Sequence, residues 1–297
     1  MKKAFLQLHI AVFLAGFTGV LGRLITLNEG MIVWWRLLLT ALTMWIFFSL
    51  AKKIHRIPFS DILKIGGVGV IAAMHWVTFY GSIKYSNVSV ALVCFSAIGF
   101  FTALFEPIIL KKKLNVMEMI LGLITLAGIY VIFHFDAQYK TGIIIGIISA
   151  VLASLFPIFN RELLKRTSVE TLLTWQQTGG LLVLSAVLPF YLQRFPTDEF
   201  IPGPENFLWL LFLAWICSVV AFQFSAYALK KLSAFTVNLT FNLEPVYGIL
   251  LAFVIYRENQ FLSRWFYIGF ALIALALIAH VFMLVKEEKK ILKHATE

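Results

Sequence analysis

Long apolar runs separated by short polar connections follow one another along the whole chain. Each run extends over about 17–25 residues, the length that an α-helix needs to cross the hydrocarbon core of a bilayer. The pattern predicts ten membrane-spanning helices, approximately at residues 5–27, 31–50, 62–85, 88–110, 116–135, 141–160, 171–192, 207–229, 234–256 and 261–285. The first run is too long for the apolar region of a signal peptide and lacks a convincing A-x-A cleavage site, so we expect a retained helix.

Composition supports this reading. Of the 297 residues, 61% are hydrophobic and 13% are charged, against about 45–50% and about 25% in soluble domains. The fold class predicted is therefore an all-α integral membrane protein. A net charge of +10 would suggest nucleic acid as partner of a soluble protein, but the basic residues here lie in short clusters between apolar runs. Cys94 and Cys217 both lie inside apolar runs, so we expect neither a disulfide framework nor a metal site, and no cofactor.

Lysine and arginine are distributed unequally between the two sides of the predicted bundle. If the runs alternate in direction, 18 loop cations lie on the side that holds both termini and six lie on the other. The positive-inside rule then predicts cytoplasmic termini in a plasma (inner) membrane. The longer outer loop, residues 195–206, carries three acidic residues and no basic one, which agrees with this orientation.

Internal similarity divides the chain into two halves, residues 1–135 and residues 136–297, the second ending in a basic tail. An offset of 147 residues pairs Lys84 in SIKYSNVSVAL with Lys231 in LKKLSAFTVNL, and Gly122 with Gly269. Because each half has an odd number of predicted helices, the second half must enter the membrane from the opposite side. Inverted repeats are typical of transporters that open a midplane site to each side in turn.

Several motifs resemble one known family. Trp35-Arg36, the two junctions quoted above and NLEPVYGILLAFVIYREN in the ninth run resemble the EamA-like family of the drug/metabolite transporter superfamily, over nearly the whole chain. The resemblance implies a basket-like bundle in which four helices of each half line a central cavity and the fifth lies at the periphery. It also implies transport of small metabolites, often amino acids outward, commonly coupled to protons. Glu106-Pro107 departs from the pattern, since the other half has no aligned acid.

Ionisable side chains inside the runs are candidate functional residues, because a charge at the bilayer centre costs roughly 2.5–3.5 kcal/mol on insertion scales. Glu244 lies midway along the ninth run beside Pro245, which removes one backbone donor. Its carboxylate is expected either to carry a coupling proton or to brace a kink and pair with Arg36. Asn238 and Asn242 share a face of the same helix, where they would contact substrate or join helices.

The third run carries a polar stripe. His75, Thr78 and Ser82 follow at helical spacing, which is typical of a cavity wall. His75 could relay a proton in the physiological range. The alternative is a neutral imidazole bonded to a neighbouring helix.

An aromatic pair lies on the same run. Trp76 and Tyr80 are four residues apart, and the repeat offset places Gln223 and Tyr227 opposite them. Core packing alone would explain aromatic residues in a chain that is 15% aromatic. Their symmetry is the reason to include all four in a predicted substrate-binding site.

Arg36 lies inside the second run, where it begins a stripe with Thr40 and Thr43. It is expected either to snorkel to the outer interface or to bind a substrate carboxylate with its planar guanidinium. Gln176, in the weaker echo Trp175-Gln176 of the seventh run, would receive a substrate ammonium together with the asparagines or Glu244. Glu106 lies close to the basic residues 111–113 and is expected to form a structural or gating ion pair.

These features predict a secondary-active transporter, an exporter of small metabolites, with amino acids or related zwitterions as first candidates. Alternating access coupled to protons is the expected mechanism. A lipid flippase or a channel of the same fold is an alternative, and an intramembrane enzyme is a third. The enzyme class lacks H-E-x-x-H and G-x-S-x-G motifs and a facing aspartate pair, so we expect no catalytic residue. Cargo identity, coupling ion and oligomeric state stay open.

Overall fold

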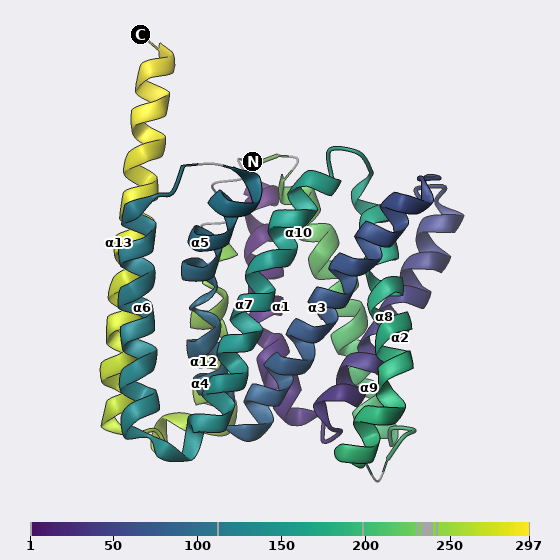
Figure 1. Ribbon diagram of the computed structural model, residues 1–297, viewed down its shortest axis with the longest axis horizontal. Helices are drawn as coiled ribbons and strands as arrows, with labels where there is room; N and C mark the ends of the chain where they lie inside the picture. The colour runs from purple at the N-terminus through teal and green to yellow at the C-terminus, as the bar shows by residue number, and fades with distance from the viewer. Residues whose placement is uncertain are drawn as a thin grey trace.

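The computed structural model is a bundle of helices that run side by side (Figure 1). It describes residues 2–111, 113–197, 199–229, 231–232, 240–241 and 243–296, and these contain no β-strand. The α-helices are α1 (Lys2–Leu24), α2 (Glu29–Leu50), α3 (Phe59–Tyr85), α4 (Val88–Phe95), α5 (Ile98–Leu110), α6 (Val116–Phe135), α7 (Lys140–Leu163), α8 (Val169–Arg194), α9 (Pro204–Ala214), α10 (Ala221–Leu229), α12 (Glu244–Tyr256) and α13 (Arg264–Thr296). Two 3₁₀ turns, η1 (Ala137–Tyr139) and η3 (Glu258–Gln260), and one π-helical segment, η2 (Trp215–Val220), complete these elements.

Eight helical segments of the described chain are long and apolar enough to cross a membrane. They are residues 2–24, 29–50, 59–85, 88–110, 116–135, 137–163, 204–225 and 264–283, and the apolar helix α12 is shorter. Large apolar side chains are exposed on the flanks of the bundle, including Leu50, Val254 and Phe282. Since hydrocarbon rather than water suits such a surface, the chain is an integral, multi-pass membrane protein.

Side-chain caps define where several helices begin. Asn28, Asn87 and Asn115 each accept a backbone N–H from the first turn of α2, α4 and α6, and Ser168 does the same for α8. Such caps satisfy donors that the helix itself leaves unpaired. Asn87 explains how α3 ends and α4 begins within two residues in the SIKYSNVSVAL junction.

The continuous helix predicted over residues 88–110 is interrupted. A turn at Ser96 and Ala97 separates α4 from α5. The ninth run is also not one helix centred on Glu244, because Glu244 is the first residue of α12. A turn precedes it, in which the Leu243 N–H donates to the Thr240 carbonyl at 3.0 Å. Pro245 therefore breaks no internal bond, since early helical positions need no N–H donor. The predicted offset of 147 residues relates Ala97 to Glu244, where these two discontinuities lie.

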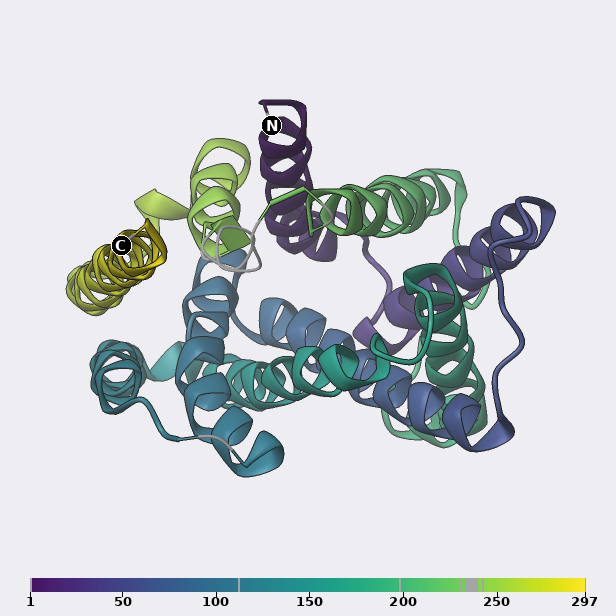
Figure 2. The same ribbon diagram turned by 90° about the horizontal axis from the view of Figure 1, so that it is seen from above.

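Glycines allow the closest helix contacts. Helix α3 packs against α7 and α8, while α6 and α13 pack on each other at one edge of the bundle (Figure 2). A methyl group on Gly69 of α3 would overlap the Gln176 carbonyl oxygen of α8. In the α6–α13 pair, a methyl group on Gly128 would lie 2.6 Å from the Gly269 carbonyl oxygen. Such contacts need small residues, as is usual between membrane helices.

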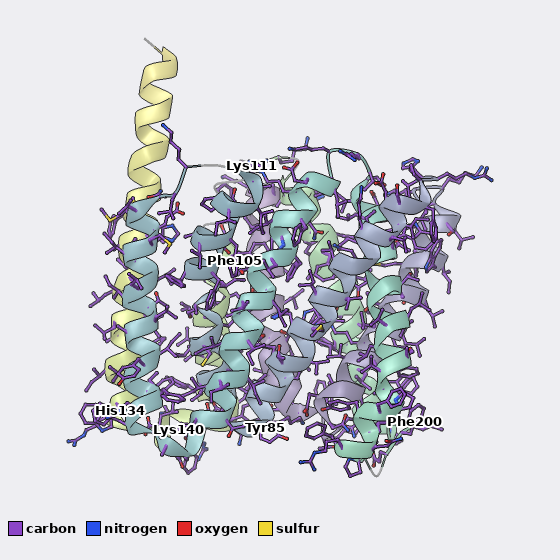
Figure 3. The ribbon with its side chains drawn as sticks, viewed as in Figure 1. Tyr85, Phe105, Lys111, His134, Lys140 and Phe200 are labelled. Carbon is purple, nitrogen blue, oxygen red and sulfur yellow. The ribbon has the colours of Figure 1, made fainter. Side chains whose placement is uncertain are left out.

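The two chain ends lie at the same end of the bundle as Lys111, and α13 extends beyond the other helices there (Figures 1 and 3). Tyr85, Lys140 and Phe200 lie at the opposite end (Figure 3). These are called the Lys111 end and the Lys140 end below.

Candidate functional site

Arg36 lies inside the bundle, seven residues along α2 from Glu29 at the Lys140 end. It is 3% exposed. Its Nε donates to Ser218 Oγ at 3.0 Å, and its Nη1 donates to Tyr80 Oη at 3.0 Å. The guanidinium therefore joins α2, α3 and η2 and does not reach the interface by snorkelling.

An aromatic ring covers the same guanidinium. Arg36 Cζ lies 4.0 Å from the centroid of the Trp76 ring, a cation–π contact. Tyr80, one turn further along α3, is fully buried. It is wedged against α1, where a methyl group on Gly22 would lie 2.5 Å from the Tyr80 ring. Arg36, Trp76, Tyr80 and Ser218 are called the Arg36 group.

Ser218 belongs to a π-helical segment that no apolar periodicity would reveal. Besides accepting from Arg36, its hydroxyl donates to the Leu213 carbonyl at 3.0 Å. Single π-helical turns within α-helices occur frequently at functional sites. The only sequence signal for Ser218 is a lone serine in the apolar stretch LLFLAWICSVVAF.

The buried charge of Arg36 is not neutralised by direct contact with a described carboxylate. The ion pairs within 4.0 Å that involve described residues do not include it. Glu244 interacts with it electrostatically without a described hydrogen bond. The Thr40 hydroxyl, one turn along α2, is also buried and has no partner within the part of the chain described. An unpaired buried cation is costly, so it calls for a ligand or a function.

Glu244 is half-buried and opens α12, which packs against α1. A methyl group on Gly16 of α1 would lie 2.8 Å from the Glu244 carbonyl oxygen. The helix dipole favours a carboxylate at this position. Asn238 and Asn242, predicted on the same face, lie outside the described residues.

His75 is buried between α3 and α7. Its Nδ1 lies 2.8 Å from Ser149 Oγ and 3.1 Å from the Ser149 carbonyl oxygen, and the Ser149 hydroxyl donates to the His75 carbonyl at 3.1 Å. Ser82 of the same predicted stripe donates to the Gly142 carbonyl at 2.7 Å. His75 and Ser82 thus join α3 to α7, whereas the Thr78 hydroxyl donates to the Met74 and His75 carbonyls of its own helix. A proton-relay role for His75 stays a prediction.

Other predicted site residues lie away from the Arg36 group. Gln176 of α8 donates to Asn160 Oδ1 of α7, nearer the Lys111 end. Trp175 packs edge-on against Trp45, with ring centroids 5.2 Å apart. The Trp35 indole donates to the Phe200 carbonyl at the Lys140 end. Of the aromatic residues in the predicted substrate-binding site, Trp76 and Tyr80 are those that contact Arg36.

Gln223 and Tyr227 lie exposed on α10, which packs against α1. They occupy the positions equivalent to Trp76 and Tyr80, but their side chains are not buried with the Arg36 group. Glu106 pairs with Arg161 of α7, Oε1 to Nη1, at 3.0 Å. This ion pair joins α5 to α7, and a gating role for it stays a prediction.

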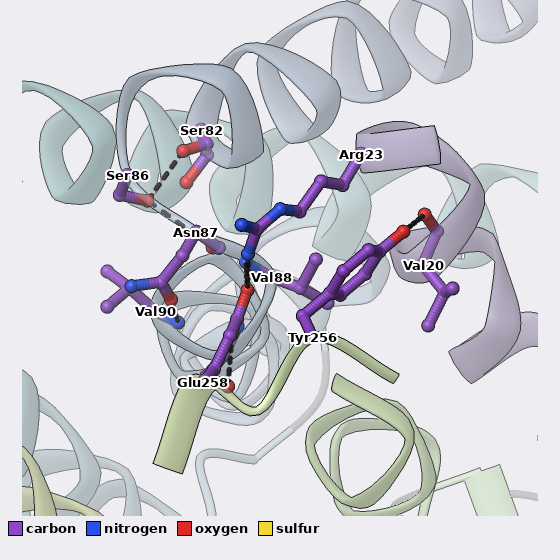
Figure 4. Close-up of polar contacts among 10 residues, drawn as sticks. Val20, Arg23, Ser82, Ser86, Asn87, Val88, Val90, Tyr256 and Glu258 are labelled. Carbon is purple, nitrogen blue, oxygen red and sulfur yellow. Dashed lines mark hydrogen bonds and ion pairs between the residues drawn. The ribbon is translucent and has the colours of Figure 1, made fainter. Parts of the chain in front are cut away.

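Sequence reasoning missed Glu258, which is 3% exposed. Its Oε1 accepts from Arg23 Nη1 at 2.7 Å and from Val88 N–H at 3.1 Å. Its Oε2 accepts from Ser89 N–H at 2.8 Å and from Ser89 Oγ at 2.6 Å (Figure 4). The carboxylate therefore ties η3 to α1 and caps α4. The sequence signal that could have indicated Glu258 is its position directly after the apolar run 234–256.

Comparison with known proteins identifies the family of this chain. The model of the EamA-like transporter family matches residues 2–134 and again residues 140–280. The chain belongs to the EamA-like transporter family. This family is part of the drug/metabolite transporter superfamily, so the predicted class is confirmed. Within the described residues, no group of three or more His, Cys, Asp or Glu side chains is placed to hold a metal ion.

Relatives of this EamA-like protein carry the same general description. A Haemophilus influenzae protein is 22% identical over 241 residues, covering 77% of this chain and 75% of its own. A Helicobacter pylori protein is 26% identical over 230 residues, covering 76% and 74%. Both are described as uncharacterized transporters. A solved crystal structure shares the fold at 17% identity, with a TM-score of 0.64 over 97% of this chain and 99% of its own.

Proposed function

We propose that this EamA-like protein is a secondary-active exporter of small carboxylated or zwitterionic metabolites, with amino acids as first candidates. The observation that carries the proposal is the buried guanidinium of Arg36, which has no described carboxylate within ion-pair distance. A membrane transporter of small molecules is what the family and the relatives already indicate. The positive charge of Arg36 favours cargo that carries a carboxylate.

A carboxylate fits the donors that remain on Arg36. A guanidinium has five N–H donors, and Tyr80 and Ser218 each take one. The others suit the forked geometry of a carboxylate. Trp76 supplies an apolar wall, and Glu244 is the described acid that interacts with Arg36 and would receive an ammonium group. Asn238, Asn242 and Gln176 stay proposed contacts for the rest of the cargo, with Gln223 and Tyr227 proposed at its far side.

Alternating access between inverted repeats is the proposed mechanism. The two family matches are of similar length, which supports ten spans in two halves. The Arg36 group combines α2 and α3 from the first half with η2 from the second. Transporters of this kind bind substrate between their repeats, close to broken helices. The equivalent breaks at Ala97 and Glu244 support the same mechanism.

Proton coupling is proposed to involve Glu244, with His75 as a second candidate. Glu244 lies at a helix break and interacts with the cation that would hold the cargo. Protonation of Glu244 would therefore change the charge balance around Arg36. A charge that can be switched next to the cargo is what coupling needs.

The Lys111 end is proposed to face the cytoplasm of a plasma membrane. Both chain ends lie there (Figure 1). The excess of 18 loop cations over six supports this direction.

Counterflow in proteoliposomes tests the proposed function. Vesicles loaded with unlabelled amino acid should accumulate labelled amino acid transiently, and amino-acid amides should compete poorly. Empty vesicles and vesicles with heat-denatured protein are the controls. Flux without saturation or exchange would indicate a channel, lipid movement between leaflets would indicate a flippase, and absence of amino-acid counterflow would overturn the cargo class.

A further inference from the structure

A polar pocket lies at the Lys140 end, outside the Arg36 group. Its volume is about 340 Å³, within the usual size for small-ligand sites. Its polar lining consists of Arg23, Lys84, Ser86, Asn87, Tyr139 and Glu258, and several of these are seen in Figure 4. We call it the Lys84 pocket.

Charges in the lining do not cancel. The charge of Glu258 is neutralised by Arg23, and each of its two carboxylate oxygens already accepts two hydrogen bonds. Lys84 Nζ donates to the Ile25 carbonyl at 2.5 Å and has no described acid within 4.0 Å. The lining residues themselves therefore carry a net charge of +1, and Glu29 of α2, which accepts from Tyr191 Oη, interacts with Lys84 from outside the lining.

Nearby groups add to this positive field. Exposed Lys140 and Arg257 adjoin the lining residues Tyr139 and Glu258 in the chain. Asp136, which directly precedes the turn η1, is buried and accepts a hydrogen bond from Ser263 Oγ at 2.7 Å. The cations are thus open to solvent while the carboxylates are engaged with protein donors.

Placement of cations here runs against the general charge bias of the chain. Six loop cations lie at the predicted outer side against 18 at the other. Two of the six, Arg23 and Lys84, line one pocket. The positive-inside rule gives no reason for cations on this side. Of the two, Arg23 has a described carboxylate partner within 4.0 Å, and Lys84 does not.

We propose that the Lys84 pocket binds a small monocarboxylate. Arg23 is 46% exposed at its side chain, which leaves N–H donors beyond the one given to Glu258 for a carboxylate. Lys84 is a further donor in the lining, together with Asn87 and the Tyr139 hydroxyl, whose side chains interact with each other. Ile83 and Phe261 complete the lining with apolar surface. A monoanion balances the net charge, whereas a phosphate dianion would leave a surplus negative charge.

This site goes beyond the proposed transport function and is separate from the Arg36 group. Lys84 lies four residues beyond Tyr80 on α3, about 6 Å further out at 1.5 Å per residue. Tyr80 is the member of the Arg36 group that contacts Gly22, which precedes Arg23 of the pocket lining in the chain. Equilibrium binding in the Lys84 pocket can be measured whether or not the chain carries cargo.

Equilibrium binding to the purified full chain tests the proposal, with propionate as probe. Saturation-transfer NMR should detect saturable propionate binding, with propionamide, its neutral isostere, bound at least tenfold more weakly. Inorganic phosphate should also bind more weakly than propionate. Lys84→Gln should weaken propionate at least tenfold, and Lys84→Arg should restore most of the affinity. Arg194→Gln, which removes an exposed cation at the same end outside this lining, should have no effect.

Equal binding of propionate to the Lys84→Gln variant and the wild type would overturn the site, because binding would then lie elsewhere, as at Arg36. Equal binding of acid and amide would overturn the charge argument. Tighter binding of phosphate would overturn the monoanion and indicate a phosphate or lipid-headgroup site. Should Lys84→Gln fail to fold, Tyr139→Phe removes a neutral donor of the same lining and should weaken propionate at least twofold. No loss in that variant would count against the proposal.

Discussion

Arg23 and Glu258 lie 235 residues apart in the chain and form an ion pair of 2.7 Å at the Lys140 end of the bundle. The same carboxylate caps α4 through the backbone of Val88 and Ser89. Tyr256 reinforces the contact, because its ring lies 4.4 Å from Arg23 Cζ. Glu258 thus links the end of α1 to the beginning of α4.

Glu258→Gln should destabilise the protein by about 2 kcal/mol. The change leaves the cap and the Arg23 contact without a charge, and the figure lies below the roughly 3–5 kcal/mol of a fully buried pair because Arg23 is partly exposed. Cys94 and Cys217 are buried, so a thiol-reactive dye can follow thermal unfolding in detergent. Glu205→Gln, at an exposed acid of the same end, is the matched control, and an equal shift in both variants would contradict the special role of Glu258.

Gly128→Ala should weaken the packing of α6 on α13, because the added methyl group would meet the Gly269 carbonyl at 2.6 Å. We expect a loss of about 1–3 kcal/mol, the usual cost of overpacking, measured by the same dye. Amino-acid binding should be retained, since α13 packs chiefly on α6. Gly99→Ala is the control, because a methyl group there would have nothing within 4 Å. If both substitutions are equally harmless, the two helices separate more easily than proposed.

Arg36→Lys should reduce affinity for amino acids at least tenfold while changing affinity for their amides little. A lysine keeps the charge but cannot donate to Tyr80 and Ser218 and lie flat on Trp76 at the same time. Tyr80→Phe removes one of these contacts and should have a smaller effect. Equilibrium binding to purified protein is the measurement. Equal loss for acid and amide would remove Arg36 from direct contact with the carboxylate.

Glu244→Gln should abolish proton-driven accumulation while leaving counterflow intact, since the amide preserves the size of the side chain but cannot carry a proton. Proteoliposomes with and without an imposed pH gradient separate the two activities. Glu106→Gln is the control, because Glu106 pairs with Arg161, and both lie in the last turns of α5 and α7, away from Glu244 in the chain. A Glu244→Gln variant that concentrates cargo like the wild type would show a structural role.

Single cysteines should report the orientation. Gln138 at the Lys140 end and Lys113 near the Lys111 end are both exposed, and the native cysteines are buried. An impermeant maleimide added to intact cells should label Gln138→Cys and should label Lys113→Cys only after permeabilisation. The reverse pattern would invert the proposed topology.

The membrane character and the positions of most helices followed from the sequence alone. Run length and hydropathy are local properties, and the bilayer imposes one length on every spanning helix. The predicted run 116–135 coincides with α6, and several others differ from the observed helix by two or three residues at an end. Caps such as Asn87 are local as well, because a side chain and a backbone three residues away suffice.

Tertiary structure alone decided which polar groups meet. Arg36 was equally compatible with snorkelling and with a buried site until Tyr80, Trp76 and Ser218 were placed around it. The break at Ser96 and Ala97 has no strong local signal, and Glu258 finds its partners 169 to 235 residues away. Such contacts depend on how distant helices pack, and nothing in the spacing of one run specifies the side chain that faces it from another.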